Sequence, residues 1–337
     1  MRITRDSLIK AAKNTVSYRT LVDKHLVAIY LTGSILTDEP LLGGTTDIDL
    51  VFVHADEPAQ AREVVRMTAE VHLDIAHYAQ SVYHPPRHLR LDPWIGTYLC
   101  QDPIMLHDTR HWFEFTQASV FDQFYYPENI LNRARPLAEA ARQTWFELQM
   151  NPAEFNPRVM YAYLKGLERA ANSIAILSGA PLTERRFMLD YAGRTSLIDR
   201  PGLHAGLSDL IGGADHFRGL DWEAAMPQWQ AALAAVSQLP DCPLRLDACR
   251  HAYYIRAAAA LRPDHPEAAA WITLRTWTEA LNHLSPENSH LSTWQAALAG
   301  LGFDSRHFEE QLKGLDAYLD GVEETLDTWA KKNGIEG

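Results

Sequence analysis

Residues 26–53 read LVAIYLTGSILTDEPLLGGTTDIDLVFV, and this stretch decides the fold. Leu26–Leu31 is short, apolar and rich in residues that favour strands, and it runs into Gly33, which permits a tight turn. Asp47–Val53 has the same character and predicts a second strand. The sequence therefore predicts two strands joined through a loop or short helix over Ile35–Thr45.

Two aspartates open the second of these strands. Asp47 and Asp49 are two residues apart, so a strand places their side chains on the same face. Without a cation the two carboxylates would repel each other, and the pair therefore indicates bound Mg²⁺. A third carboxylate, Asp74, lies in the apolar stretch VHLDIAHY (residues 71–78), which predicts a further strand and a partner for the buried charge. Each feature alone is weak, because an Asp-x-Asp pair usually marks a turn or a solvated edge.

Together, the order and spacing of these residues resemble the nucleotidyltransferase superfamily that includes DNA polymerase β and the aminoglycoside nucleotidyltransferases. The family pattern is a strand, a Gly-Ser turn that opens a helix, and Ser/Thr-Asp-hydrophobic-Asp-hydrophobic on the next strand, with a third acid on a later strand. The matching residues here are Gly33-Ser34, Thr46-Asp47-Ile48-Asp49-Leu50 and Asp74. Many members also carry Arg-Gly shortly after Gly-Ser, whereas this chain has Ile35–Leu42 and then Gly43-Gly44.

The resemblance implies a role for each matching residue. The catalytic and metal-binding residues would be Asp47, Asp49 and Asp74. They would hold two Mg²⁺ ions on the phosphates of ATP or another nucleoside triphosphate, and Asp74 would either ligate metal or accept the proton of the substrate hydroxyl. The residues that would contact the nucleotide in this half are Gly33, Ser34 and Thr46.

The rest of the first 110 residues alternates between helix and strand patterns. Apolar positions at the helical period predict a helix over Ile3–Lys24 and another over Glu57–Glu70. A helix-like stretch around Trp94–Leu99 precedes a weaker strand at Pro103–Leu106. With the resemblance, this predicts an α+β fold in which a mixed sheet forms the nucleotidyltransferase domain.

After about residue 115 the strand signals disappear and helical patterns take over. The predicted helices are Leu131–Met150, Pro157–Leu177, Trp222–Val236, Pro243–Ala260, Pro266–Leu281 and Phe308–Trp329. Such a change marks a domain boundary, which we place near Glu114–Val120. We therefore predict a nucleotidyltransferase domain over residues 1–117 and an α-helical domain over residues 118–337, with the active site between them.

The helical half adds two candidate phosphate contacts. In similar nucleotidyltransferases, a basic residue of the helical domain closes over the triphosphate. Lys165 on the predicted Pro157–Leu177 helix and Arg185 after it are the candidates for this role, although basic residues on helices usually form a solvated face.

Composition limits the classes of partner and compartment. The chain has 337 residues, of which 31 are Lys or Arg and 43 are Asp or Glu, giving a formal net charge of −12. A surface of this charge repels phosphate backbones, so we expect no long nucleic acid as a partner, and a template-independent RNA polymerase is disfavoured. Three cysteines without a CxxC pair, no signal-peptide pattern and no long apolar run predict a cytoplasmic protein without a membrane partner.

These expectations combine into one predicted function with two alternatives. The predicted activity is transfer of a nucleoside monophosphate, AMP from ATP in the first instance, to a hydroxyl of a small acceptor such as an aminoglycoside-like antibiotic, with release of pyrophosphate. An acidic protein suits a polycationic acceptor. The alternatives are a protein adenylyltransferase of the toxin–antitoxin type and a non-catalytic nucleotide sensor. The sequence leaves the oligomeric state open.

Overall fold

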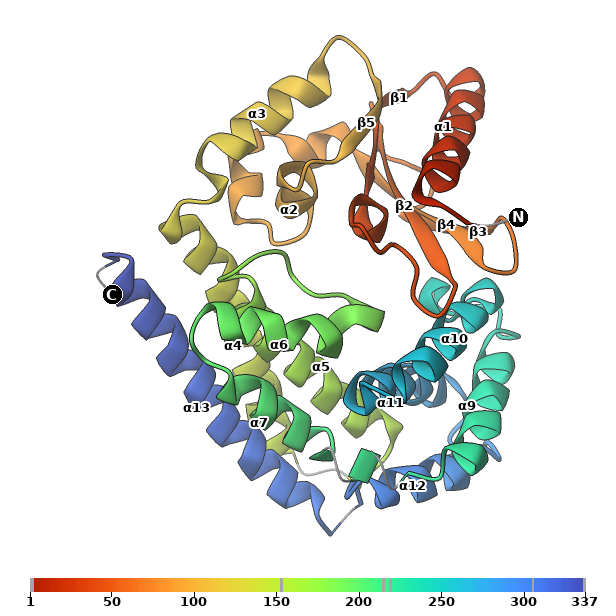
Figure 1. The fold of residues 1–337 in the computed structure, drawn as a ribbon, viewed down its shortest axis with the longest axis vertical. Helices are drawn as coiled ribbons and strands as arrows, with labels where there is room; N and C mark the ends of the chain where they lie inside the picture. Colours follow the sequence, from red (N-terminus) through yellow and green to blue (C-terminus); the bar gives the residue numbers. More distant parts are fainter. Residues whose placement is uncertain (1–2, 152–153, 214–215, 218–219, 305, 336–337) are drawn as a thin grey trace. The chain divides into compact units, whose positions relative to one another are not determined.

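The chain folds into two compact units, which divide between Asn129 and Ile130. The computed structural model describes residues 3–151, 154–213, 216–217, 220–304 and 306–335. Met1–Asn129 contains a mixed five-stranded sheet with flanking helices, and the described part of Ile130–Gly337 contains helices only (Figure 1). The predicted α+β class is confirmed at this level.

The first unit begins with helix α1 (Arg5–Val22), close to its predicted bounds. Its helices and 3₁₀ helices after α1 are η1 (Gly33–Leu36), η2 (Gln80–Tyr83), η3 (Pro86–Leu91), α2 (Ile95–Cys100) and α3 (Trp112–Phe124). Its strands are β1 (Leu26–Thr32), β2 (Thr46–His54), β3 (Arg62–Arg66), β4 (Val71–Ala79) and β5 (Ile104–Asp108). Their order in the sheet is β3-β4-β2-β1-β5. Strands β2 and β4 pair in parallel, and the other neighbours pair antiparallel.

Strand alternation gives the sheet two apolar faces. Ile48, Leu50 and Phe52 of β2 pack in one core with α1, while Val51 and Val53 pack in a second core on the other face. The second core includes side chains of α2 and α3. The odd-numbered residues of β2 therefore face the side that α2 and α3 cover.

The prediction of a helix over Glu57–Glu70 is wrong, because this segment contains the edge strand β3. Arg62 pairs with Ala76 and Val64 with Asp74 in an antiparallel ladder. The adjacent β-branched residues Val64 and Val65 suit a strand, and pairing with the edge of β4 outweighs the local helical pattern.

The predicted domain boundary, Glu114–Val120, lies inside α3. Phe113, Val120 and Phe124 of this helix belong to the core of the first unit, so α3 packs with the sheet. The division between the units comes after α3, near the start of α4 (Pro127–Met150).

The second unit is built around a buried central helix. Besides α4, the α-helices among its described residues are α5 (Pro157–Ala175), α6 (Phe187–Leu197), α7 (Gly202–Leu210), α9 (Trp222–Val236), α10 (His251–Leu261), α11 (Pro266–His283), α12 (Leu291–Gly300) and α13 (Phe308–Lys332). The central helix is α11. Every residue of α11 from Ala268 to Leu281 is buried, including Arg275 and Glu279. Charged side chains in such a position need partners within the unit.

The prediction of one helix over Pro243–Ala260 is wrong in its first half. This stretch forms two short 3₁₀ helices, η5 (Leu244–Leu246) and η6 (Ala248–Arg250), before α10 begins. The Asp247 side chain accepts a hydrogen bond from the backbone N–H of Cys249. An aspartate that binds the backbone in this way favours a turn over a continuous helix.

Candidate functional site

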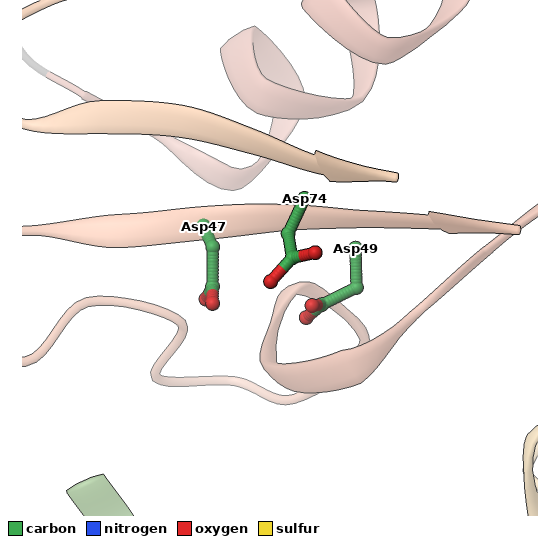
Figure 2. A group of neighbouring side chains, drawn as sticks. All are labelled: Asp47, Asp49 and Asp74. Carbon is green, nitrogen blue, oxygen red and sulfur yellow. The ribbon is translucent and has the colours of Figure 1, made fainter. Parts of the chain in front are cut away.

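Three carboxylates meet on one face of the sheet in the first unit. Asp47 and Asp49 lie on β2, and the parallel ladder places Asp74 of β4 directly beside Asp49. One oxygen from each of the three carboxylates lies within 4.8 Å of the others. Figure 2 shows the three side chains on the same side of the strands. Asp47 and Asp74 are buried, and Asp49 is partly exposed. We call these three residues the acidic cluster. Asp47 and Asp49 are neighbours on one strand face, and strand register brings Asp74 to them.

Gly33 lies directly against this cluster. It follows β1, whose last residue Thr32 pairs with Asp49, and its φ of +79° is in the region that favours glycine. A Cβ built on Gly33 would lie 1.8 Å from Oδ2 of Asp49. No other amino acid fits here without moving that carboxylate, so the Gly33 backbone forms one wall of the cluster.

The loop from Ser34 to Thr46 is compact and tied together by hydrogen bonds. It begins in η1, a single 3₁₀ turn rather than an α-helix. Leu42 and Thr45 pair through both backbone groups, and Gly43 and Gly44 between them both have positive φ. This is the geometry of a two-residue type I′ turn, which glycine favours at both central positions. The two glycines therefore close a tight turn in this loop.

Ser34 and Thr46, predicted to bind phosphate, both contact backbone of the same loop. The Thr46 hydroxyl is buried and donates to the carbonyl oxygen of Pro40 at 2.9 Å. The Ser34 hydroxyl lies 3.5 Å from the same oxygen. Both side chains thereby hold the loop in place beside the cluster, and phosphate binding by either remains a prediction.

Arg62 is a binding partner of the acidic cluster that the sequence did not reveal. Its Nε and Nη2 donate to Oδ1 and Oδ2 of Asp74 at 2.5 Å and 2.7 Å. The Asp74 side chain is 1% exposed and that of Arg62 is 51% exposed. This is the partner that the buried carboxylate was expected to need. Its only signal in the sequence is a basic residue at the start of β3, which the incorrect helix prediction concealed.

Tyr98 of α2 is a second neighbour of the acidic cluster that the sequence did not single out. Its phenol is largely buried, and burial raises its pKa, with the charge of Asp49 and a weaker influence of Asp74 adding to the shift. The raised pKa favours the neutral phenol, and its dependence on Asp49 and Asp74 places Tyr98 within electrostatic range of the acidic cluster.

Lys165 and Arg185, the predicted phosphate contacts of the helical half, lie in the second unit. Lys165 of α5 donates to Glu168 at 2.8 Å, and burial lowers the pKa of its ammonium group. Arg185 lies in η4 (Glu184–Arg186), is 5% exposed, and places its guanidinium carbon 3.3 Å from the ring centre of Tyr253. Within the second unit, both basic groups are therefore engaged by neighbouring side chains rather than forming a solvated face.

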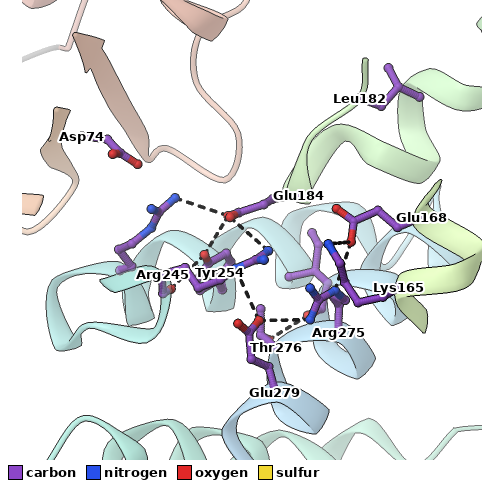
Figure 3. A network of polar contacts seen from close by, with 12 residues as sticks. Asp74, Lys165, Glu168, Leu182, Glu184, Arg245, Tyr254, Arg275, Thr276 and Glu279 are labelled. Carbon is purple, nitrogen blue, oxygen red and sulfur yellow. Dashed lines mark hydrogen bonds and ion pairs between the residues drawn. The ribbon is translucent and has the colours of Figure 1, made fainter. Parts of the chain in front are cut away.

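Lys165 is the first member of a network of ion pairs in which positive and negative side chains alternate. The ion pairs link, in order, Lys165, Glu168, Arg275, Glu279, Arg245, Glu184 and Arg250. Figure 3 labels the first six of these residues. Arg275 and Glu279 come from the buried face of α11 and lie 3.0 Å apart. The pairs satisfy the charges that helix α11 buries, so this network accounts for charged residues at core positions.

The donor set of the acidic cluster suits a hard divalent cation. Carboxylate oxygens are ligands that Mg²⁺ prefers, and one or two carboxylates commonly hold it together with substrate phosphates. The three carboxylates and the Arg62 guanidinium together leave two negative charges, which one divalent cation would balance. The residues present therefore fit Mg²⁺.

No protein-family model and no curated protein matches this chain. Among the described residues, no helix combines the length and apolar character that crossing a bilayer requires. The function must therefore be argued from the cluster itself.

Proposed function

We propose that the chain is an Mg²⁺-dependent nucleotidyltransferase of the DNA polymerase β-like type. The observation that carries this proposal is that Asp47, Asp49 and Asp74 lie close together, with the backbone of Gly33 directly against Asp49. The proposal is supported because the features that carry the resemblance, a Gly-Ser turn after one strand, two acids on the next and a third acid on a later strand, lie close together in the fold. The family assignment rests on this likeness of site.

The proposed reaction transfers a nucleoside monophosphate, AMP from ATP in the first instance, to a hydroxyl of a small molecule. The acceptor oxygen forms a bond to the α-phosphorus, the bond from that phosphorus to the bridging oxygen breaks, and pyrophosphate leaves. The hydroxyl proton passes to a base or to water. Bound Mg²⁺ would supply charge neutralisation on the phosphates and make the acceptor hydroxyl more acidic.

The side chains of this chain would perform the positioning. Asp47 and Asp49 would hold the metal from one strand, which fixes their spacing. Asp74 would be the third carboxylate of the acidic cluster. The absence of a side chain at Gly33 leaves room for the Asp49 carboxylate where it stands. Lys165 and Arg185 remain predicted phosphate contacts. The acidic net charge of −12 supports a cationic acceptor, such as an aminoglycoside.

A non-catalytic nucleotide sensor is the second candidate. Both oxygens of Asp74 already accept hydrogen bonds from Arg62, which favours a site that binds a nucleotide without turnover. The candidate predicts Mg²⁺-dependent ATP binding with no product for any acceptor.

The test is pyrophosphate release from ATP with Mg²⁺ and a panel of aminoglycosides. We expect release with the wild-type chain and a loss of at least about 100-fold in Asp47→Asn and Asp49→Asn, because each removes a charged ligand. The matched control is Asp56→Asn, whose side chain is 80% exposed and pairs with His25 outside the cluster. Full activity in Asp47→Asn or Asp49→Asn would contradict the proposal.

A further inference from the structure

The contact between Arg62 and Asp74 has the geometry of a clamp. Arg62 lies on β3 opposite Ala76, and Asp74 lies opposite Val64, so the guanidinium reaches diagonally across the ladder to the carboxylate. Two parallel N–H···O bonds of 2.5 Å and 2.7 Å join the two groups. Such a paired contact fixes the plane of the carboxylate as well as its position.

This contact also changes the charge that the cluster offers to a cation. Asp74 is 1% exposed at its side chain, so its charge is screened little by solvent and is balanced chiefly by a neighbouring cation. Arg62 supplies that cation permanently and competes with a metal ion for the same oxygens. A metal that approaches Asp74 must therefore share the carboxylate with a guanidinium or displace it.

We propose that Arg62 is a positioning residue that clamps Asp74 and holds it out of cation binding in the resting protein. In the absence of nucleotide, the divalent cation is then held chiefly by Asp47 and Asp49. This inference rests on the proposed function, since it concerns the regulation of the same metal site. It also explains how three carboxylates within 4.8 Å of one another are compatible with a stable sheet when no metal is bound.

The experiment measures Mn²⁺ binding to the full chain without nucleotide, by electron paramagnetic resonance of the free ion. We expect Arg62→Met to tighten Mn²⁺ binding by about 3- to 10-fold, because it removes a positive charge and releases Asp74. Arg62→Lys keeps the charge but loses the paired contact, and its affinity should lie between those of the wild type and Arg62→Met. Asp47→Asn should weaken binding at least about 10-fold and Asp74→Asn by clearly less.

Arg66→Met is the matched control, because Arg66 is an exposed arginine on the same face of the same strand. It should leave the Mn²⁺ affinity unchanged. A second readout is the rise in Tm that Mg²⁺ produces, which should be larger in Arg62→Met than in the wild type. Weaker or unchanged Mn²⁺ binding in Arg62→Met would overturn the proposal, and so would equal losses in Asp74→Asn and Asp47→Asn. If Arg62→Met does not fold, Arg62→Lys and the two aspartate variants decide.

The same experiment separates this inference from the proposed function. No arm uses nucleotide or turnover, so Mn²⁺ affinities can follow the expected order in a protein that transfers no nucleotide. If the wild-type chain binds no Mn²⁺ without nucleotide, the proposed function is still decided by pyrophosphate release from ATP, because carboxylates commonly hold Mg²⁺ together with substrate phosphates. The role of Arg62 then survives only if Arg62→Met creates a Mn²⁺ site that the double variant Arg62→Met/Asp74→Asn lacks.

Discussion

At the scale of single residues, Gly33 has the most demanding environment of the candidate site. Two separate constraints act on it: a φ of +79°, and a carboxylate oxygen of Asp49 where a Cβ would stand. Gly44 shares only the first constraint, with a φ of +72° and no atom within 4 Å of a built Cβ. The two glycines therefore allow the effect of backbone strain to be separated from the effect of displacing Asp49.

Gly33→Ala should lose both Mn²⁺ affinity and any nucleotidyl transfer by at least about 10-fold, because the methyl group must push the Asp49 carboxylate aside. Gly44→Ala should cost about 1 kcal/mol of unfolding free energy from its backbone conformation alone, with the Mn²⁺ affinity retained. Mn²⁺ titration and urea denaturation of both variants check this. Equal Mn²⁺ affinities for the two variants would show that Gly33 has no special role.

Single residues also show what the sequence could and could not predict. Asp47, Asp49 and Asp74 were identifiable, since two lie on one strand with period two and the third interrupts an apolar strand. Arg62 was not, because its role depends on β3 pairing with β4, and a stretch with few buried residues carries little information about its partner strand.

At the scale of elements, β2 and β4 carry a histidine pair on the sheet face opposite to the acidic cluster. His54 Nε2 lies 2.9 Å from His77 Nδ1. The charged groups around the pair come from several elements: Asp23 and Arg19 at the end of α1, His25 before β1, and Glu63 on β3. Burial lowers the pKa of both histidines, and the nearby carboxylates oppose this effect only in part.

This histidine pair should make the protein less stable in acid. The unfolded chain takes up protons near the ordinary histidine pKa of 6.5, while the folded pair takes them up only at lower pH. Between these values the unfolded state binds more protons, so the free energy of unfolding falls as the pH falls below about 6.5. His77→Gln should flatten this dependence below pH 6.5, as measured by urea denaturation at several pH values.

His111→Gln is the control for this titration, because the His111 side chain is 75% exposed and contacts only the surface residue Glu114 among the pairs described. Its pH dependence should match that of the wild type. An unchanged slope in His77→Gln would show that other groups dominate the acid response.

Elements differed in how well local sequence determined them. Strands β1, β2 and β4 and helices α1, α5 and α11 are marked by apolar runs or by apolar positions at helical spacing. Their predicted positions agree with the structure within a few residues. Helices α6, α7 and α12 were not predicted, because with 11, 9 and 10 residues they are too short to show a clear helical period. Their existence depends on packing against neighbours, which local pattern does not encode.

At the scale of the whole molecule, charge is used in two different ways. The acidic cluster of the first unit gathers like charges, whereas the ion-pair network of the second unit alternates them. No local rule predicts the network, since its members are spread from Lys165 to Glu279 in the sequence. Their proximity follows from the packing of the helices around α11.

Arg275→Met should destabilise the protein by about 3 kcal/mol, because it leaves the buried carboxylate of Glu279 and the half-buried carboxylate of Glu168 short of a partner. Arg142→Met is the control. Arg142 pairs with three carboxylates whose side chains are 42–72% exposed. Its loss should therefore cost at most about 1 kcal/mol of unfolding free energy. Urea denaturation compares the two variants. A smaller loss in Arg275→Met than in Arg142→Met would contradict the expected effect of burial.

Because β2 and β4 pair in parallel, insertions in the connection between them and insertions within β4 should have different effects on the acidic cluster. Residues added between His54 and Arg62 lengthen a surface connection and leave Asp49 opposite Asp74. One residue added within β4 before Asp74 would turn that side chain toward the α1 face and bring Leu73 or the added residue into its place. Tolerance to insertion should therefore fall abruptly between the connection before Arg62 and strand β4. A scan of single-residue insertions, with folding measured for each variant, would show which residues the site requires without any ligand.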